Sequence, residues 1–225
     1  MRKVFPENGN TYGLYTFSDK QGHDLSLAPN ATVGTMRSYL TNEKFEELQP
    51  VYYYYMEKFF RQSRNEKECY IIGGEIIGET DPIIDAQMIY LTYTCLKKIG
   101  LDEGVIIRVN SYGNEKEMTK FKEELSDFYA NKKHLLTPEM QEMMEKNILS
   151  VFTSNQEDEK ILAESSTPIQ KFLKKDSKLH YEKVKEYLTD LGVPFIEDHT
   201  LFFQEEYYTN TVWTISTKEN VLVSR

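Results

Sequence analysis

The early part of the chain has alternating apolar and polar positions and continues into two long apolar runs, the first of them rich in tyrosine. Residues 14–27, LYTFSDKQGHDLSL, alternate on both sides of Lys20-Gln21-Gly22, which predicts a β-hairpin whose second strand ends near Leu27. The runs VYYYYMEKFF and CYIIGGEIIGE enclose the polar loop RQSRNEKE. Two apolar runs around a charged loop predict a long antiparallel strand pair.

Helical patterns separate these β-rich segments. The stretch APNATVGTMRSYL predicts a helix that starts near Asn30 or Thr32. A longer helix is expected after Asp81, which can cap it, with Pro82 in the first turn and Gly100 at the end. Its predicted apolar stripe consists of Ile84, Met88, Leu91, Cys95 and Ile99. The run GVIIRVNS then reads as a short buried strand.

The character of the sequence changes between about residues 114 and 192, where the pattern is helical and heavily charged. Cap signals at Thr137-Pro138 and Thr167-Pro168 mark helix starts, the second opening a helix over 168–192. Strand patterns return afterwards, and LFFQEEYYTNTVWTIS (201–216) reads as one strand. We therefore predict an α+β fold in which a core of residues 1–113 and 193–225 carries a helical insertion at 114–192. A mostly antiparallel sheet with helices on one side is expected.

Composition narrows the classes of function. The 225 residues carry a formal net charge of −9, which argues against loose, charge-driven binding to nucleic acid. Cys69 and Cys95 fit neither a disulfide framework nor a zinc pattern, so a reducing, cytoplasmic setting is expected. No apolar run approaches the roughly 20 residues that cross a bilayer, and no signal peptide is evident at the start.

Metal and phosphate-loop motifs are not found in the sequence. His23, His134, His180 and His199 form no spaced pair with another His or Cys, and all four are interpreted as surface or loop residues. Gly73-Gly74 lacks the Gly-Lys-Ser/Thr that follows in a phosphate-binding loop. We therefore predict no metal site.

An ordered set of segments resembles the histidyl-tRNA synthetase family. SDKQGHDLSLAPNAT resembles the family's Asp-Lys-x-Gly followed by Leu-Arg-Pro-Glu-x-Thr, and KFFRQSRNEKECYIIGGEIIGE resembles its second class II motif with the following strand. DPIIDAQMI resembles Asp-Ala-Glu-Val-Ile, VIIRVNSYGN resembles Ile-Asn-Ser-Leu-Gly, and EEYYTNTVW resembles Leu-Asp-Tyr-Tyr-Thr-x-Thr-Val-Phe. The matches follow the family order from about Tyr12 to Thr214.

The resemblance implies a class II aminoacyl-tRNA synthetase-like fold with an antiparallel sheet. It also implies that the family's first motif, third motif and anticodon-binding domain have no counterpart in this chain. The first motif forms the family's dimer, yet exposed strand edges favour a homodimer here or docking of a partner protein.

Arg61 falls where the family's second-motif arginine meets the α-phosphate of ATP. Joining a carboxylate to a phosphate requires cations that neutralise the developing charge. Arg61 is therefore the candidate phosphate contact, and the alternative is a strand-end arginine in water or in a salt bridge. Two residues later the family has Glu, whereas this chain has Ser63.

The segment LAPNAT departs from the family at the residues that face the substrate. Asn30 replaces the Glu that meets the substrate ammonium group, and Ala28 replaces the preceding arginine. A neutral hydrogen bond is roughly half as strong as a charge-assisted one. Thr32 is retained as a candidate ligand contact, although a threonine at this point also serves as a helix cap.

Glu75 matches a family glutamate that helps to bind histidine, but Ile71 stands where the family has Gln. A carboxylate among isoleucines and glycines is costly to bury unless it is paired. Glu75 therefore either holds a ligand cation or bonds within the protein, and it is a candidate ligand-binding residue.

The stretch from Phe203 to Tyr208 shows the clearest loss of positive charge relative to the family pattern. The family has Arg-Gly-Leu-Asp-Tyr-Tyr, and here Phe203 replaces the arginine while Glu205 and Glu206 add negative charge. Negative charge near a triphosphate raises the barrier by Coulomb repulsion. Tyr207 and Tyr208 are retained, either to wall an aromatic or imidazole pocket or for cross-strand contacts.

Three hypotheses follow. The first is a degenerate synthetase paralogue, a pseudoenzyme that binds an amino-acid-like ligand or a partner and for which tRNA binding is doubtful. The second is an active histidine–tRNA ligase fragment that uses ATP and Mg²⁺. The third is a relative of the regulatory subunit of ATP phosphoribosyltransferase. The substitutions on the substrate side favour the first.

Overall fold

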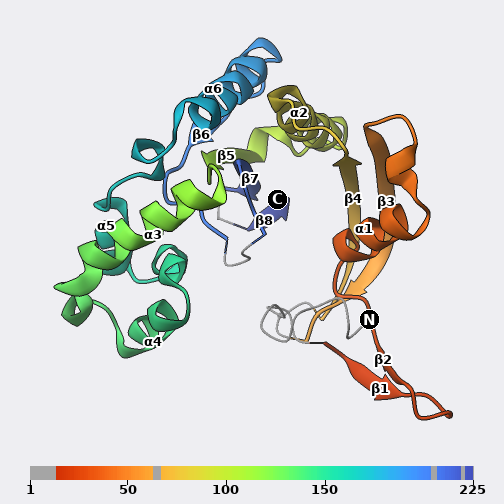
Figure 1. Cartoon of the computed structure of the whole chain (residues 1–225), viewed down its shortest axis with the longest axis horizontal. Helices are drawn as coiled ribbons and strands as arrows, with labels where there is room; N and C mark the ends of the chain where they lie inside the picture. Colours follow the sequence, from red (N-terminus) through yellow and green to blue (C-terminus); the bar gives the residue numbers. More distant parts are fainter. Residues whose placement is uncertain (1–13, 63–66, 204–206, 219–220, 225) are drawn as a thin grey trace. The chain divides into compact units, whose positions relative to one another are not determined.

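The computed structural model describes residues 14–62, 67–203, 207–218 and 221–224. The chain divides after Thr80 into two compact units, the first up to Thr80 and the second from Asp81 onward (Figure 1). Each unit has its own secondary structure and is described by itself. The predicted division at residues 113 and 192 remains a prediction.

The first unit consists of two antiparallel strand pairs and a helix. Strands β1 (Thr16–Ser18) and β2 (Asp24–Ser26) form the predicted hairpin. Helix α1 (Thr32–Thr41) follows, then the short η1 (Lys44–Glu46). Strands β3 (Val51–Phe60) and β4 (Glu68–Ile77) pair antiparallel along their whole length. The hairpin, the helix start and the long strand pair are thereby confirmed.

The register of β3 and β4 sorts their side chains onto two faces, because successive residues of a strand point to opposite sides. Tyr53 lies opposite Glu75 and Tyr55 lies opposite Gly73, and Ile71 shares this face. The other face carries large exposed side chains, namely Tyr52, Tyr54, Met56, Tyr70 and Ile72.

The second unit has a four-stranded sheet in the order β6-β5-β7-β8. Strand β5 (Val105–Ser111) pairs antiparallel with β7 (Thr211–Thr217), which pairs antiparallel with β8 (Leu222–Ser224). The short β6 (Ile196–Glu197) is parallel to β5. Antiparallel pairs with one parallel addition, together with the helices, confirm the α+β class.

Helix α2 (Pro82–Lys98) begins as predicted, because the Asp81 side chain accepts a hydrogen bond from the Ile83 N–H and Pro82 lies in the first turn. Its buried face is different from the predicted stripe. Ala86, Ile89 and Leu96 are buried against the sheet core, whereas Leu91, Cys95 and Ile99 are exposed. Several apolar positions surround this helix, so periodicity alone did not identify the inward face.

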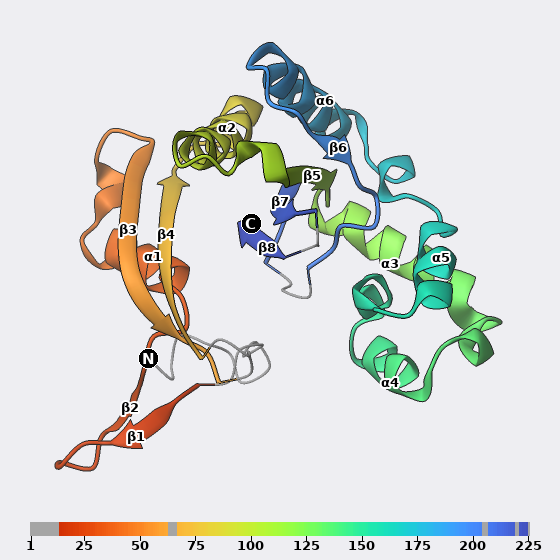
Figure 2. The same ribbon diagram turned by 180° about the vertical axis from the view of Figure 1, so that it is seen from behind.

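Residues 115–190 form the helical part of the second unit, coloured green to blue in Figure 2. The helices are α3 (Glu115–Ala130), α4 (Pro138–Lys146), α5 (Glu157–Glu164) and α6 (Lys175–Asp190). Short 3₁₀ segments connect them, η3 (Lys133–Leu135), η4 (Ile148–Thr153) and η5 (Ile169–Lys171). The side chains of Asn114 and Thr137 cap α3 and α4.

Two sequence-based boundaries were wrong. The predicted helix 168–192 is divided into η5 and α6, since the N–H of Lys174 is bonded to the Glu117 carboxylate instead of continuing a helix. Of the described residues in the predicted strand 201–216, only those from Thr211 onward form a strand. The preceding Asn210 adopts a left-handed conformation with φ of 53°, which interrupts extended pairing.

The second unit has two apolar cores. One joins α2, α6 and the sheet, and it includes Ile89, Val109, Val184 and Ile215. The other lies among α3, α4, η4 and the end of β5, and it is rich in stacked rings such as Tyr112, Phe121 and Phe202. No helix in the described residues has the length and apolar character needed to span a membrane.

Candidate functional site

Two predicted residues of the first unit, Thr32 and Glu75, lie in a polar cluster on the inner face of the β3–β4 pair. The Tyr55 hydroxyl donates a hydrogen bond to Glu75 Oε1 over 3.4 Å. The side chain of Thr32, at the start of α1, lies beside both groups and opposes the rise in the pKa of Glu75 and of Tyr55. The cluster of Thr32, Tyr55 and Glu75 is called the hydroxyl–acid cluster below.

Gly73 makes room for this cluster. A Cβ atom built on Gly73 would lie 2.3 Å from the ring of Tyr55, so no side chain fits there without moving the tyrosine. The ring of Tyr55 therefore lies over bare backbone, and its hydroxyl is directed toward Glu75 across the strand pair.

Burial dominates the electrostatics of the hydroxyl–acid cluster. It raises the pKa of Glu75, and the hydrogen bonds from Thr32 and Tyr55 offset this only in part. Burial also raises the pKa of Tyr55, and the neighbouring Glu75 carboxyl adds to that shift. Among the ion pairs of the described residues, none involves Glu75. A partly buried acid with hydroxyl partners is suited to accept a donor from a ligand.

Arg61 lies at the end of β3 and holds the segment before α1. Its Nε donates a hydrogen bond to the backbone oxygen of Pro29 over 2.9 Å, and the N–H of Phe60 bonds to the oxygen of Ala28 over 2.9 Å. Asn30, in the same segment, has a buried side-chain oxygen without a hydrogen-bond partner. Arg61, Ala28 and Asn30 are thus neighbours, and Ser63 lies outside the described residues.

The aromatic candidates belong to the second unit. The ring centroid of Phe203 is 4.9 Å from that of Tyr208, and Tyr207 and Tyr208 are 4.8 Å apart. Tyr208 also meets Tyr112 edge-on at 6.2 Å. Tyr207 is two-thirds exposed. Phe203 therefore packs into an aromatic group, and Glu205 and Glu206 lie outside the described residues.

Sequence reasoning missed Tyr55 and Tyr112. Tyr55 was one of four consecutive tyrosines, and only the register of β3 against β4 distinguishes it from its neighbours. Tyr112 had a visible signal, since it stands at the leucine of the Ile-Asn-Ser-Leu-Gly pattern. Its hydroxyl contacts the backbone of Phe203.

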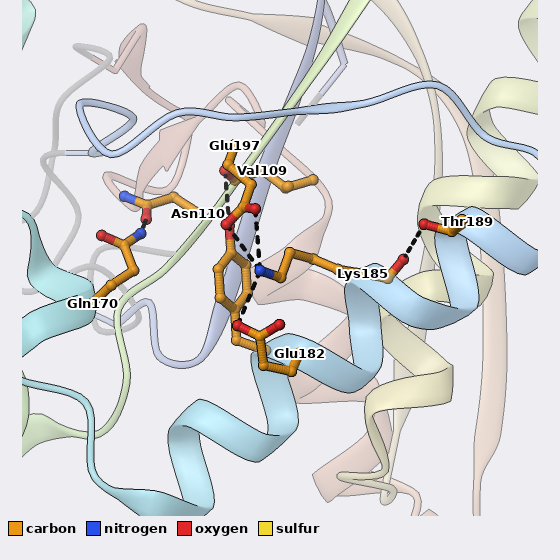
Figure 3. Close-up of polar contacts among 8 residues, drawn as sticks. Val109, Asn110, Gln170, Glu182, Lys185, Thr189 and Glu197 are labelled. Carbon is orange, nitrogen blue, oxygen red and sulfur yellow. Dashed lines mark hydrogen bonds and ion pairs between the residues drawn. The ribbon is translucent and has the colours of Figure 1, made fainter.

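A separate polar group joins α6 to the sheet (Figure 3). Lys185 lies between Glu182 and Glu197, with nitrogen–oxygen distances of 3.0 Å to each, and its Nζ is 4.9 Å from the ring centroid of Tyr181. The Tyr181 hydroxyl donates to the backbone oxygen of Val109 over 3.3 Å. These contacts fix the helix on β5 and suggest a structural role.

The histidines were only partly placed from sequence. His180 lies in α6, not in a loop, and its Nε2 is 2.8 Å from Asp85 Oδ2 in α2. Its side chain is only 16% exposed, so the surface interpretation was wrong for this residue. Within the described residues, no group of three or more His, Cys, Asp or Glu side chains is arranged to hold a metal ion.

Comparisons with known proteins agree with the ordered motifs. The chain is 30% identical over 210 residues to a histidine–tRNA ligase from Halothermothrix orenii, an alignment that covers 92% of this chain and 50% of that protein. The apo histidyl-tRNA synthetase of S. aureus superposes with a TM-score of 0.72 and 26% identity, over 94% of this chain and 51% of that one. No protein-family model matches the sequence.

Two further structures are similar in fold. A Bacillus halodurans protein described as an ATP phosphoribosyltransferase regulatory subunit/histidyl-tRNA synthetase gives a TM-score of 0.62 at 21% identity, covering 93% of this chain and 59% of that one. The ATP phosphoribosyltransferase complex of Thermotoga maritima gives 0.53 at 13% identity, covering 92% and 77%. The chain spans about half the length of the curated relatives it matches.

Proposed function

Because this chain is a relative of the histidyl-tRNA synthetases, with their class II fold, we propose that it binds a small ligand without forming an aminoacyl adenylate. The observation that carries the proposal is the hydroxyl–acid cluster, in which the Tyr55 hydroxyl donates to the partly buried Glu75 on the inner face of the β3–β4 pair. The fold and one acidic contact are retained, while the substrate-facing residues around them differ from the family pattern.

Electrostatics supports the loss of adenylation. Bringing a carboxylate against a phosphate needs cations placed in advance. Phe203, at the arginine position of the pattern, packs against Tyr208, and Asn30 supplies a neutral oxygen where the pattern has a carboxylate. Arg61 remains, with its Nε bonded to the Pro29 oxygen. A single arginine supplies only part of the positive charge that adenylation requires.

The hydroxyl–acid cluster favours a ligand that donates hydrogen bonds, such as an imidazole or an amine. A donor that reaches Glu75 would offset the burial that disfavours its charge. The buried Asn30 oxygen, lacking a partner, is a second acceptor that a ligand could satisfy. Tyr207 and Tyr208, in the second unit, stay candidate ligand-binding residues by their match to the family pattern. Histidine is therefore the first compound to test.

Thermal stability with and without ligand tests the proposal. Histidine at excess should raise the melting temperature, since a ligand that binds only the native state stabilises it by mass action. Glu75→Gln should abolish most of that shift, while the matched exposed variant Glu57→Gln on β3 should keep it. No shift with histidine, histidinol or imidazole would contradict the ligand-binding half of the proposal.

Pyrophosphate exchange tests the other half. The protein with ATP, Mg²⁺ and histidine should show no histidine-dependent incorporation of pyrophosphate into ATP. Exchange at a rate like that of a full-length synthetase would instead establish the second hypothesis, an active ligase fragment that uses ATP and Mg²⁺. The sequence similarity to histidine–tRNA ligases is the reason to test this alternative.

A regulatory role is the second candidate function. It is favoured by the fold similarity to the Bacillus halodurans protein and the Thermotoga maritima complex, both of which are named for ATP phosphoribosyltransferase. Under this proposal the partner is a catalytic subunit of that enzyme. Co-purification with such a subunit, and a change in its activity, would support it, whereas separate elution of the two proteins would contradict it.

Two further expectations belong to the proposal. The free Cys69 and Cys95 fit a reducing, cytoplasmic setting. The exposed apolar face of the β3–β4 pair favours self-association or a partner protein. Gel filtration at high concentration would reveal a homodimer, and a monomer there would contradict self-association.

A further inference from the structure

The segment Leu201–Phe203 is attached to the end of β5 by two side chains. Asn110 Nδ2 donates to the backbone oxygen of Leu201 over 3.1 Å, and Gln170 Nε2 donates to Asn110 Oδ1 over 2.7 Å (Figure 3). Two residues later, the Tyr112 hydroxyl accepts a hydrogen bond from the N–H of Phe203 and donates to the oxygen of the same residue. Side chains of β5 and its extension thus take the place of a neighbouring strand.

Both attachments are buried. Asn110 is fully buried and Tyr112 is 2% exposed. Buried hydrogen bonds of this kind are costly to lose, because water does not readily replace the missing partner. The aromatic contacts of Tyr112 reinforce its position, with centroids 5.1 Å from Phe202 and 6.2 Å from Tyr208.

The two ends of the Tyr112–Phe203 contact are both departures from the family pattern described above. Tyr112 stands at the leucine of Ile-Asn-Ser-Leu-Gly, and Phe203 stands at the arginine of Arg-Gly-Leu-Asp-Tyr-Tyr. A leucine has no hydroxyl with which to hold the backbone of residue 203. The hydroxyl contact therefore depends on the tyrosine that this chain has in place of the leucine.

We propose that Tyr112 is a positioning residue that fixes the backbone of Phe203 and thereby seats the Phe203 ring on Tyr208. The hydroxyl holds both polar groups of one peptide residue, and the ring closes the space beside it. The position of the pattern's arginine is then occupied by a secured aromatic side chain. This inference goes beyond the proposed function, and it does not depend on what the protein binds.

Amide hydrogen exchange measured residue by residue by NMR tests the inference. Tyr112→Phe keeps the ring and removes the hydroxyl. The Phe203 amide should then exchange roughly tenfold faster, as expected when one buried hydrogen bond is lost. The amides of Leu125 and Val109, deep in the two cores, should exchange as in the wild type. A local change with unchanged core amides distinguishes positioning from general destabilisation.

Tyr187→Phe is the matched control, since Tyr187 is a partly buried tyrosine of α6 beside the other core. It should leave the Phe203 amide unchanged. Equal exchange at Phe203 in the wild type and in a folded Tyr112→Phe variant would overturn the inference. If that variant does not fold, the exchange rate of the Phe203 amide in the wild type is the test. The inference then requires this amide to exchange at least tenfold more slowly than in a random coil.

Discussion

Glu75 in the first unit and Glu117 in the second are both withdrawn from water, yet their partners differ in kind. Glu117 accepts hydrogen bonds from two backbone N–H groups, those of Asn114 over 2.8 Å and Lys174 over 2.7 Å. Glu75 accepts a hydrogen bond from the Tyr55 hydroxyl over 3.4 Å and has the Thr32 side chain beside it. The Glu117 carboxylate satisfies backbone groups at two helix termini. The Glu75 carboxyl contacts side chains that could also bind a ligand.

The pKa values of the two groups move in opposite directions. Burial by itself raises the pKa of Glu117, but the N–H donors of Asn114 and Lys174 outweigh it and bring the pKa below its ordinary value. Burial raises the pKa of Glu75, and its hydroxyl partners do not compensate. Glu159 resembles Glu117, since bonds from Ser154 and Thr137 overcome its burial and lower its pKa.

Burial alone therefore does not identify a functional carboxylate. Glu117 joins the N-terminal ends of α3 and α6, so its charge is used by the fold. Among the described residues of its own unit, no backbone N–H group bonds to Glu75, so its charge has no comparable use there. A group whose ionised form is left uncompensated is a candidate for binding.

The largest effect is expected from Glu117→Gln. The amide keeps the shape of the side chain but accepts with one oxygen only, so one of the two backbone N–H groups loses its partner. We expect a loss of about 2–3 kcal/mol in the free energy of unfolding at neutral pH. Urea unfolding measures it, with the exposed Glu123→Gln on the same helix as the control.

The pH dependence of the Glu117→Gln effect has a defined direction. Since the folded pKa of Glu117 lies below its ordinary value of 4.5, its contribution is complete above that value. The contribution is lost as the pH falls through the folded pKa, so wild type and variant should converge in acid. A gap that persists unchanged in acid would contradict an ionised Glu117 in the fold.

A smaller effect of opposite sign is expected from Glu75→Gln. Glutamine accepts from the same hydroxyls without a charge to bury, so the variant should be more stable at neutral pH by on the order of 1 kcal/mol. The folded pKa of Glu75 lies above the ordinary 4.5, so the folded state holds its proton longer than the unfolded state. The stability of the wild type therefore falls as the pH rises from 4.5 toward the folded pKa.

Unfolding curves across this pH range measure the difference between Glu75→Gln and wild type. The gap should open above pH 4.5 and then become constant. A variant less stable than wild type at neutral pH would place Glu75 with Glu117 as a structural carboxylate. The comparison of the two units would then fail.

Local patterns predicted much of the fold. The alternation around Lys20-Gln21-Gly22, the two apolar runs and the Asp81-Pro82 helix start each depend on neighbours in sequence, and all three were right. The two boundary errors have a common cause. The backbone of Lys174 is held by Glu117 and that of Phe203 by Tyr112, and both partners are distant in sequence; the left-handed Asn210 adds a local break directly before β7.

For the candidate site, the sequence indicated single residues but not their contacts. The pattern singled out Glu75 and Thr32 separately, and the structure brings them together through α1 and β4. Tyr55 became visible only with the register of β3, because four tyrosines in a row carry no information about which one faces inward. Sequence spacing identified the residue types, and tertiary contacts decided their partners.

The smallest effect is expected from Glu197→Gln, a half-exposed acid whose partner is the Lys185 ammonium group. Its side chain is 50% exposed, and Lys185 keeps a second partner in Glu182 at 3.0 Å (Figure 3). The loss should be about 0.5 kcal/mol or less, and it should shrink at high salt because exposed charges are screened. Urea unfolding at low and high salt measures both properties. A salt-independent loss as large as that of Glu117→Gln would contradict this expectation. It would show that this ion pair contributes as much to stability as a carboxylate bonded to backbone N–H groups.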